Sequence, residues 1–147
     1  MITNKIALAS DHAGFDLKEE IKEYLSNLGV EIVDLGTNDN TSVNYASYGK
    51  KMGQYIKDNK DSFGIIVCGT GIGISIAANR YKEVRAALCH STEYASLARK
   101  HNDANVLALG SRFGDSKESI NIVKEFFTTD FEGGRHKDRV DTLGEKV

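Results

Sequence analysis

The 147-residue sequence contains no proline, only two cysteines and no long apolar run. Two cysteines cannot form the disulfide framework that holds small secreted domains together. The first five residues lead directly into an apolar stretch of about five residues, which is shorter than the core of a signal peptide or a membrane span. We therefore expect a cytoplasmic protein with reduced thiols. The absence of proline has no functional interpretation.

The charges are nearly balanced, with 19 lysines and arginines against 21 aspartates and glutamates and a net charge of −2. This balance argues against a protein whose main role is to bind nucleic acid or an anionic membrane surface. Any anion site must therefore be local and built from a few positive groups. The length suits one hydrophobic core, so we predict a single domain over residues 1–147, with a basic C-terminal tail at residues 130–147.

Short β-rich runs alternate along the chain with longer segments of helical period. The runs are rich in Ile, Val, Leu and Ala without strict polar alternation, which is typical of strands buried on both faces. They are Ile6–Ser10, Glu31–Leu35, Gly64–Cys68, Arg85–Cys89 and Asn105–Leu109. Helices are expected between them from apolar spacings of three and four, as at Leu17, Ile21, Tyr24, Leu25 and Leu28. The alternation predicts a three-layer α/β/α, Rossmann-like fold with a five-stranded parallel sheet.

The most distinctive segment, Cys-Gly-Thr-Gly-Ile-Gly at residues 68–73, lies at the end of the third predicted strand. Ligands bind outside the carboxyl ends of the strands in such folds. Three alternating glycines allow a tight turn and a close approach of the backbone to a ligand, with helix N–H groups directed at it. The same groups can stabilise a thiolate at Cys68. The alternative is a structural turn around an inert buried cysteine.

Three established fingerprints do not fit this segment. A P-loop ends in Gly-Lys-Ser/Thr, and no lysine follows here. The dinucleotide fingerprint needs a third glycine where the sequence has Ile74 or Ile76. A cysteine phosphatase needs an arginine soon after its nucleophile, whereas the first arginine is Arg80. The segment is therefore a ligand loop of another kind, or a structural turn.

Two polar motifs with histidine each have two interpretations. Asp11 and His12 close the first strand, where they can orient a substrate hydroxyl or form an Asx-type turn beside a surface histidine. His101 and Asn102 follow the fourth helix, where they suit proton transfer and hydroxyl recognition. Histidine and asparagine are also favoured as a simple helix C-terminal stop.

The tail places Arg135 and Arg139 four residues apart, on one face if the segment is helical. Two guanidinium groups that converge suit phosphate, although a solvated basic terminus is the alternative. Tyr45 lies in the second loop and can turn toward the same sheet end. The remaining groups show no such pattern: Arg80, Lys82 and Arg85 are interpreted as solvated, and Cys89 as structural.

Together these motifs resemble the ribose/galactose isomerase family, and within it the ribose-5-phosphate isomerase B group. The resemblance extends over nearly the whole chain. It rests on four motifs in order, at residues 9–14, 68–79, 101–112 and 133–140.

The resemblance implies an aldose–ketose isomerase that interconverts ribose 5-phosphate and ribulose 5-phosphate through an enediol(ate), with no metal and no cofactor. It implies that Cys68 is the base, that Thr70 handles the proton on the carbonyl side, and that His101 opens the furanose ring with Asp11 of a neighbouring subunit. The implied substrate-binding residues are His12, Tyr45, Gly69, Gly71, Gly73, Asn102, Arg112, Arg135 and Arg139. Because family sites combine two subunits, a homodimer or homotetramer is implied.

The subtype can be narrowed further from the resemblance. One branch of the family replaces the cysteine by a glutamate six positions later, and that position here is Ile74. Members often have Tyr-Pro-Asp in the second loop, whereas this chain has Tyr45-Ala46-Ser47. A six-carbon substrate such as allose 6-phosphate therefore remains an alternative. A non-catalytic sugar-phosphate-binding module is a further alternative, because fold alone does not fix function.

Overall fold

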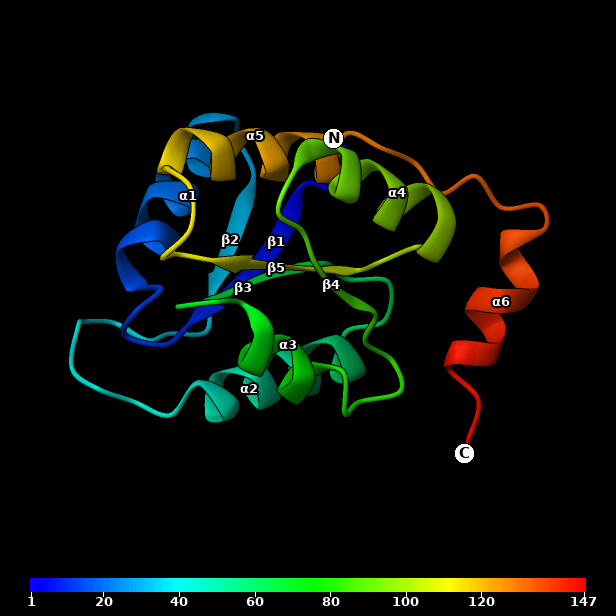
Figure 1. Ribbon diagram of the computed structural model, residues 1–147, viewed down its shortest axis with the longest axis horizontal. Coiled ribbons are helices and arrows are strands. Elements are labelled where there is room, and N and C mark those ends of the chain that lie inside the picture. The colour runs from blue at the N-terminus through cyan, green and yellow to red at the C-terminus, as the bar shows by residue number, and fades with distance from the viewer.

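A computed structural model describes all residues from Met1 to Val147 and shows a parallel sheet between two helical layers (Figure 1). The strands are β1 (Lys5–Ser10), β2 (Glu31–Asp34), β3 (Gly64–Cys68), β4 (Ala86–Leu88) and β5 (Val106–Gly110). The helices are α1 (Phe15–Asn27), α2 (Tyr45–Asp58), α3 (Ile72–Ala78), α4 (Thr92–Asn102), α5 (Ser116–Phe127) and α6 (His136–Leu143). The predicted fold class is confirmed.

All neighbouring strands pair in parallel, in the order β2-β1-β3-β5-β4. The predicted strands differ at their ends: β4 is shorter than the predicted run from Arg85 to Cys89, and β5 lies one residue later than predicted. The side chain of Asn79 pairs with the outer edge of β4. It accepts the N–H of Ala86 at 2.8 Å and donates to the carbonyl of Ala86 at 3.0 Å, so it satisfies this edge of the sheet locally.

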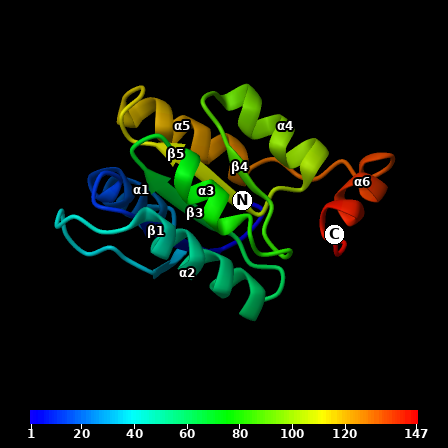
Figure 2. The ribbon, with the colours of Figure 1, turned by 60° about the horizontal axis from the view of Figure 1, so that its bottom comes forward.

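The two helical layers follow from the alternation of side chains along each strand. On β1, Ile6 and Leu8 pack with α1 and α5, whereas Ala7 and Ala9 pack against the side that carries α2 and α3. Figure 2 shows α2 and α3 side by side on this second face. Because β3 alternates in the same way, Cys68 belongs to the α2–α3 side.

The first turns of two helices are capped by the side chain of the residue before the helix. Ser91 accepts the N–H of Tyr94 at the start of α4, and Asp115 accepts the N–H of Glu118 at 2.8 Å at the start of α5. Leu28 was expected on the buried face of α1, but it is the C-cap and is 54% exposed. No helix is long and apolar enough to cross a membrane.

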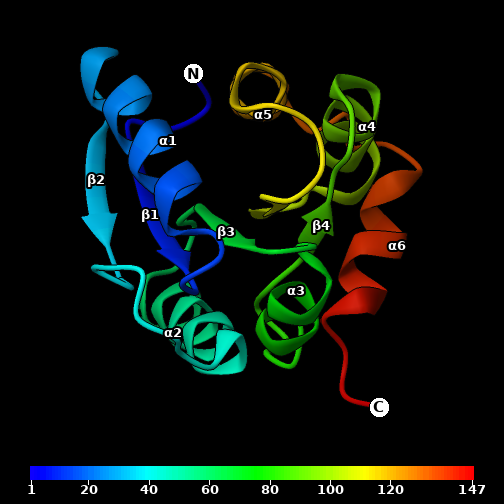
Figure 3. The same ribbon diagram turned by 60° about the vertical axis from the view of Figure 1, so that its left-hand side comes forward.

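The basic tail is more ordered than its composition predicts, because it contains α6. This helix packs against α4 and lies on the opposite side of the molecule from α1 and β2 (Figure 3). His136, at its first turn, is buried. The domain therefore carries a separate helical element beside one end of α4.

Candidate functional site

Cys68 lies at the carboxyl end of β3 with its sulfur held by the turn that follows. The backbone N–H of Gly71 donates to Cys68 Sγ at 3.2 Å, and the residue is 4% exposed. Gly71 has φ of 79°, and a Cβ there would lie 2.5 Å from Leu88 Cδ1 and 2.9 Å from the carbonyl carbon of Leu109. Only glycine fits this position. A backbone donor is therefore directed at the Cys68 sulfur.

Thr70 lies in the same turn, one residue before Gly71. Its Oγ1 accepts the N–H of Ile72 at 3.1 Å. An accepted bond leaves the hydroxyl proton free to be donated elsewhere. Thr70 therefore has a hydrogen-bond donor left in the turn that holds the Cys68 sulfur.

The other two glycines of the segment allow side chains to lie directly on the loop. A Cβ on Gly69 would stand 2.9 Å from the guanidinium carbon of Arg112, and one on Gly73 would collide with the ring of Tyr45. Arg112 is further fixed through its own N–H, which donates to the carbonyl of Gly69 at 3.0 Å. Gly69 and Gly73 therefore allow Arg112 and Tyr45 to lie against the turn that holds Cys68.

Asp11 and His12 face the same turn from the end of β1. Asp11 is 6% exposed, and its Oδ1 accepts the N–H of Gly14, three residues further on, at 2.9 Å, so its side chain supports the local turn. His12 Nδ1 accepts the N–H of Val43 at 3.1 Å. A neutral ring with Nδ1 as acceptor carries its proton on Nε2, so His12 has a hydrogen-bond donor left for a ligand.

These residues line one cleft of about 460 Å³. Glycines of the loop line it, together with six other predicted site residues from four separate parts of the chain. These six are Asp11, His12, Tyr45, Cys68, Thr70 and Arg112. Its rim also carries Ile72 and Ile76, which are about half exposed. A carboxylate, a thiol, hydroxyls and two cationic or donor side chains around one cleft suit a polyhydroxylated anion.

The other predicted residues form a second group that does not line this cleft. His101 and Asn102 end α4, which runs antiparallel to the strands and so finishes at the opposite, amino edge of the sheet, just before β5. Arg135 and Arg139 lie on the tail beside them, and Arg139 Nη1 donates to the carbonyl of Arg135 at 3.5 Å. Within one chain, the second group is therefore separated from Cys68.

His101 has two neighbours that the sequence did not single out. Its ring stacks on that of His136, with centroids 4.3 Å apart and planes 16° apart. Glu132 Oε1 lies 3.9 Å from His101 Nε2 and 3.6 Å from His136 Nε2. Burial lowers the pKa of His136, and the nearby positive groups, His101 first, act in the same direction. His136 is therefore kept neutral beside His101.

These three side chains are the one group of possible metal ligands with ligand atoms close together, all within 4.8 Å. The rings of His101 and His136 are nearly parallel, so their in-plane nitrogen lone pairs point in parallel directions and do not converge on one metal position. Ligand atoms around a tetrahedral zinc stand about 3.3 Å apart, given bonds of about 2.0–2.1 Å. The arrangement of His101, Glu132 and His136 thus suits hydrogen bonding and proton transfer better than metal ligation.

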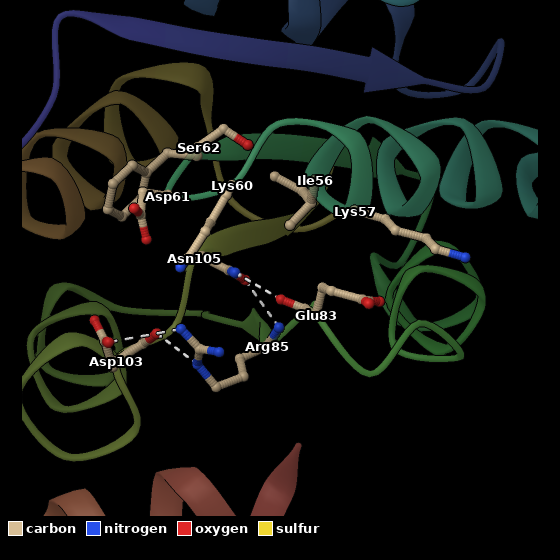
Figure 4. A pocket seen from close by; sticks show the side chains of 10 residues that line it. Ile56, Lys57, Lys60, Asp61, Ser62, Glu83, Arg85, Asp103 and Asn105 are labelled. Carbon is tan, nitrogen blue, oxygen red and sulfur yellow. Dashed lines mark hydrogen bonds and ion pairs between the residues drawn. The ribbon is translucent and has the colours of Figure 1, made fainter. Parts of the chain in front are cut away.

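A further pocket of about 430 Å³ lies at the amino edge of the sheet (Figure 4). Its charged side chains are balanced, three of each sign: Lys57, Lys60, Arg85, Asp61, Glu83 and Asp103. Arg85 was interpreted as solvated, and this is wrong. Its Nε donates to the carbonyl of Asp103 at 2.8 Å, and burial lowers its pKa. Because its charges balance, the pocket shows no preference for an anion.

Cys89 is buried and structural, as expected. It is 3% exposed, and burial raises the pKa of its thiol to about 12. Of the two cysteines, Cys68 alone opens onto the cleft described above.

Known proteins resemble this chain over nearly its full length. Residues 6–143 match the Ribose/Galactose Isomerase family. A putative sugar phosphate isomerase of Rickettsia conorii is 46% identical over 97% of this chain and 99% of its own length. Ribose-5-phosphate isomerase B of Escherichia coli is 42% identical over 95% of this chain and 93% of its own length.

Solved structures agree with this assignment. Ribose 5-phosphate isomerase B of Thermotoga maritima is 50% identical, with a TM-score of 0.92 over 95% of this chain and 97% of that structure. The Mycoplasma genitalium enzyme, solved with bound ribulose-5-phosphate, is 44% identical, with a TM-score of 0.91 over 95% of this chain and 93% of that structure. The resemblance predicted from four sequence motifs is confirmed, and the chain belongs to the ribose/galactose isomerase family.

Proposed function

We propose that this isomerase interconverts ribose 5-phosphate and ribulose 5-phosphate by proton transfer through an enediolate, without a metal ion. The observation that carries the proposal is the Cys68 sulfur, which accepts the Gly71 N–H at 3.2 Å inside a cleft that also presents Thr70 and Arg112. The names and the bound ligand of the relatives support the choice of substrate.

In the proposed reaction the Cys68 thiolate removes the proton from C2 of the open-chain aldose. The C2–H electrons form the C1–C2 double bond of the enediolate, and the negative charge develops on O1. Backbone N–H groups of residues 69–73 support this charge, and Thr70 exchanges the hydroxyl proton between O1 and O2. Cys68 then returns its proton to C1, which gives the ketose with no net change in atoms or electrons.

The second group of residues completes the site from another subunit. His101 would open the furanose ring of the substrate with Asp11 of the neighbouring chain, and Asn102 would bind a sugar hydroxyl. Arg135 and Arg139 would hold the phosphate with His12 and Arg112 of the first chain. The exposed Ile72 and Ile76, 53% and 52% exposed, offer an apolar rim that a second subunit would cover.

A coupled assay of the two pentose phosphates tests the proposal in wild-type enzyme and in Cys68→Ala. General acid–base groups contribute roughly 100- to 10,000-fold, so Cys68→Ala should lose at least about 100-fold in kcat. Near wild-type turnover in this variant would remove Cys68 as the base. Activity lost in a chelator and restored by a divalent metal would contradict the metal-free step.

A six-carbon sugar phosphate is the second candidate substrate. Tyr45 lines the cleft, while the two residues after it are Ala46 and Ser47 in place of the Pro-Asp often found in relatives. Comparing kcat/KM for ribose 5-phosphate and allose 6-phosphate decides between them. A sugar-phosphate-binding protein without activity would bind both compounds and convert neither.

A further inference from the structure

Arg99 is a buried cation between the two elements that carry the second group of site residues. It lies in α4 and is 4% exposed, although it is charged. Buried charges are retained in proteins only when they are paired and hydrogen-bonded. The position of this arginine therefore has to be explained by its partners.

The guanidinium of Arg99 makes three hydrogen bonds to two segments of the chain. Its Nη1 donates to Asp103 Oδ1 at 2.8 Å and to the carbonyl of Ala104 at 2.7 Å, and its Nε donates to the carbonyl of Thr129 at 3.1 Å. The rings of Phe63 and Phe126 lie 5.4 and 5.8 Å from its central carbon. Directional donors and flat aromatic neighbours together fix the orientation of the group.

The pair formed by Arg99 and Asp103 spans His101 and Asn102. Asp103 is the C-cap of α4 and has φ of 45°, a left-handed conformation that costs energy in a residue with a side chain. Two arginines hold Asp103 in this conformation. Arg99 Nη1 donates to its Oδ1 at 2.8 Å, and Arg85 Nε, in the pocket of Figure 4, donates to its carbonyl at 2.8 Å. The end of α4 is thereby clamped on both sides of His101.

The bond to Thr129 extends the same clamp to the tail. Thr129 follows α5 and begins the segment that leads to Glu132, whose N–H donates to the carbonyl of Lys100 at 3.1 Å. This segment continues through Gly133 and Gly134 to Arg135 and His136. One guanidinium therefore joins the end of α4 to the start of the tail that carries the predicted phosphate ligands.

We propose that Arg99 is a positioning residue that aligns the end of α4 with the tail, so that His101 and the Arg135–Arg139 pair act on one substrate together. Only the kinetic effect of this alignment rests on the proposed function. The alignment itself is a property of the fold, and it is visible in the stack of His101 on His136. Lysine at this position keeps the charge, but its donors all diverge from one nitrogen and cannot reproduce the planar fork of Nε and Nη1.

The first test is spectroscopic and needs no substrate. The chain has 4 histidines, so their ring signals can be followed by NMR in wild type and in Arg99→Lys. We expect the His101 and His136 signals to lose their mutual ring-current shifts in the variant, while those of His12 and His90 stay in place. Unchanged His101 and His136 signals in folded Arg99→Lys would overturn the proposal.

The second test is kinetic and separates positioning from loss of fold. KM for ribose 5-phosphate reports the phosphate ligands. The ring step is reported by the ratio of two rates: deuterium exchange into C1 of ribulose 5-phosphate, and conversion of this ketose into ribose 5-phosphate. The ketose stays open because its O5 is phosphorylated, so the exchange itself needs no ring step. In Arg99→Lys, KM and the exchange-to-conversion ratio should both rise about 10-fold, the lower range for supporting residues of a site.

Two comparison variants make the outcome decisive. Val123→Ala removes buried volume from the same core face and should reduce the folded fraction without changing KM or the ratio. Asp103→Asn keeps a residue that tolerates the left-handed backbone and should give a smaller change in the same direction. If Arg99→Lys behaves like Val123→Ala in both readouts, Arg99 only supports the fold. If wild type itself does not isomerise either sugar, the NMR comparison still decides the alignment.

Discussion

The ring of His101 stacks on the ring of His136, and a single carboxylate oxygen of Glu132 lies within 4 Å of a nitrogen of each. Two imidazoles this close cannot both be protonated without mutual repulsion. The buried member, His136, is the one whose pKa is lowered. The more exposed member, His101, is the one proposed to exchange a proton with the substrate.

Acid should destabilise the fold through His136. Its pKa lies below the ordinary value of 6.5 in the folded state, so the unfolded chain binds more protons once the pH falls below about 6.5. Stability should thus decrease from pH 6.5 downward until the folded pKa is passed. Thermal unfolding across pH 7.5 to 5 checks this in wild type and His136→Phe, which keeps the stacking surface. An equally steep loss in the phenylalanine variant would assign the effect to other groups.

Gly71→Ala should disrupt both the fold and the site. The substitution combines an unfavourable φ of 79° with contacts to Leu88 and to the backbone of Leu109, so a loss of about 2–4 kcal/mol is expected. Gly29→Ala is the matched control, because its φ is 82° but nothing lies within 4 Å of the added Cβ. The control should lose only about 1–2 kcal/mol and keep full activity. Equal losses in urea unfolding of the two variants would show that the tight packing at Gly71 is unimportant.

Mixed subunits should recover activity that neither parent has. If Cys68 and His101 serve one substrate from different chains, a hybrid of Cys68→Ala and His101→Asn has one intact site and one doubly damaged site. Random mixing of inactive parents into dimers should then restore about a quarter of wild-type activity. Unfolding and refolding the two variants together, with each refolded alone as the control, measures this. No recovery in verified hybrids would place both residues in the same-chain site.

Arg135→Ala should chiefly raise KM for the sugar phosphate, by about 10-fold or more, because one charge-assisted phosphate contact is lost. Its fold should be little changed, since the side chain is exposed and no ion pair holds it. Arg80→Ala, an exposed arginine away from the cleft, is the control and should leave KM as in wild type. An unchanged KM in Arg135→Ala would move the phosphate contact to other residues.

Local patterns in the sequence were sufficient for the features that local backbone geometry determines. The turn from Cys68 to Gly71 follows from its glycine spacing. The motif around His101 was ambiguous by itself, because a helix stop and a proton-transfer group have the same local pattern. The resemblance gave it a role, and the structure shows it beside the tail.

Features that depend on tertiary burial were not visible in the sequence. Arg99 lies on a helix between Ala98 and Lys100, and nothing in that pattern shows that its guanidinium is buried against Thr129. Arg85 was assigned to solvent for the same reason. Glu132 lies in an irregular segment, and its place beside His101 results from how the tail folds back on α4.

Because α4 runs antiparallel to the strands, the proposed activity should depend on the protein concentration. Because α4 carries His101 to the opposite sheet edge from Cys68, a folded chain on its own holds two unfinished halves of the proposed site. For a dimer with the proposed shared site, dilution below its dissociation constant should then reduce turnover without unfolding the protein. In that range the rate should fall with the square of the protein concentration.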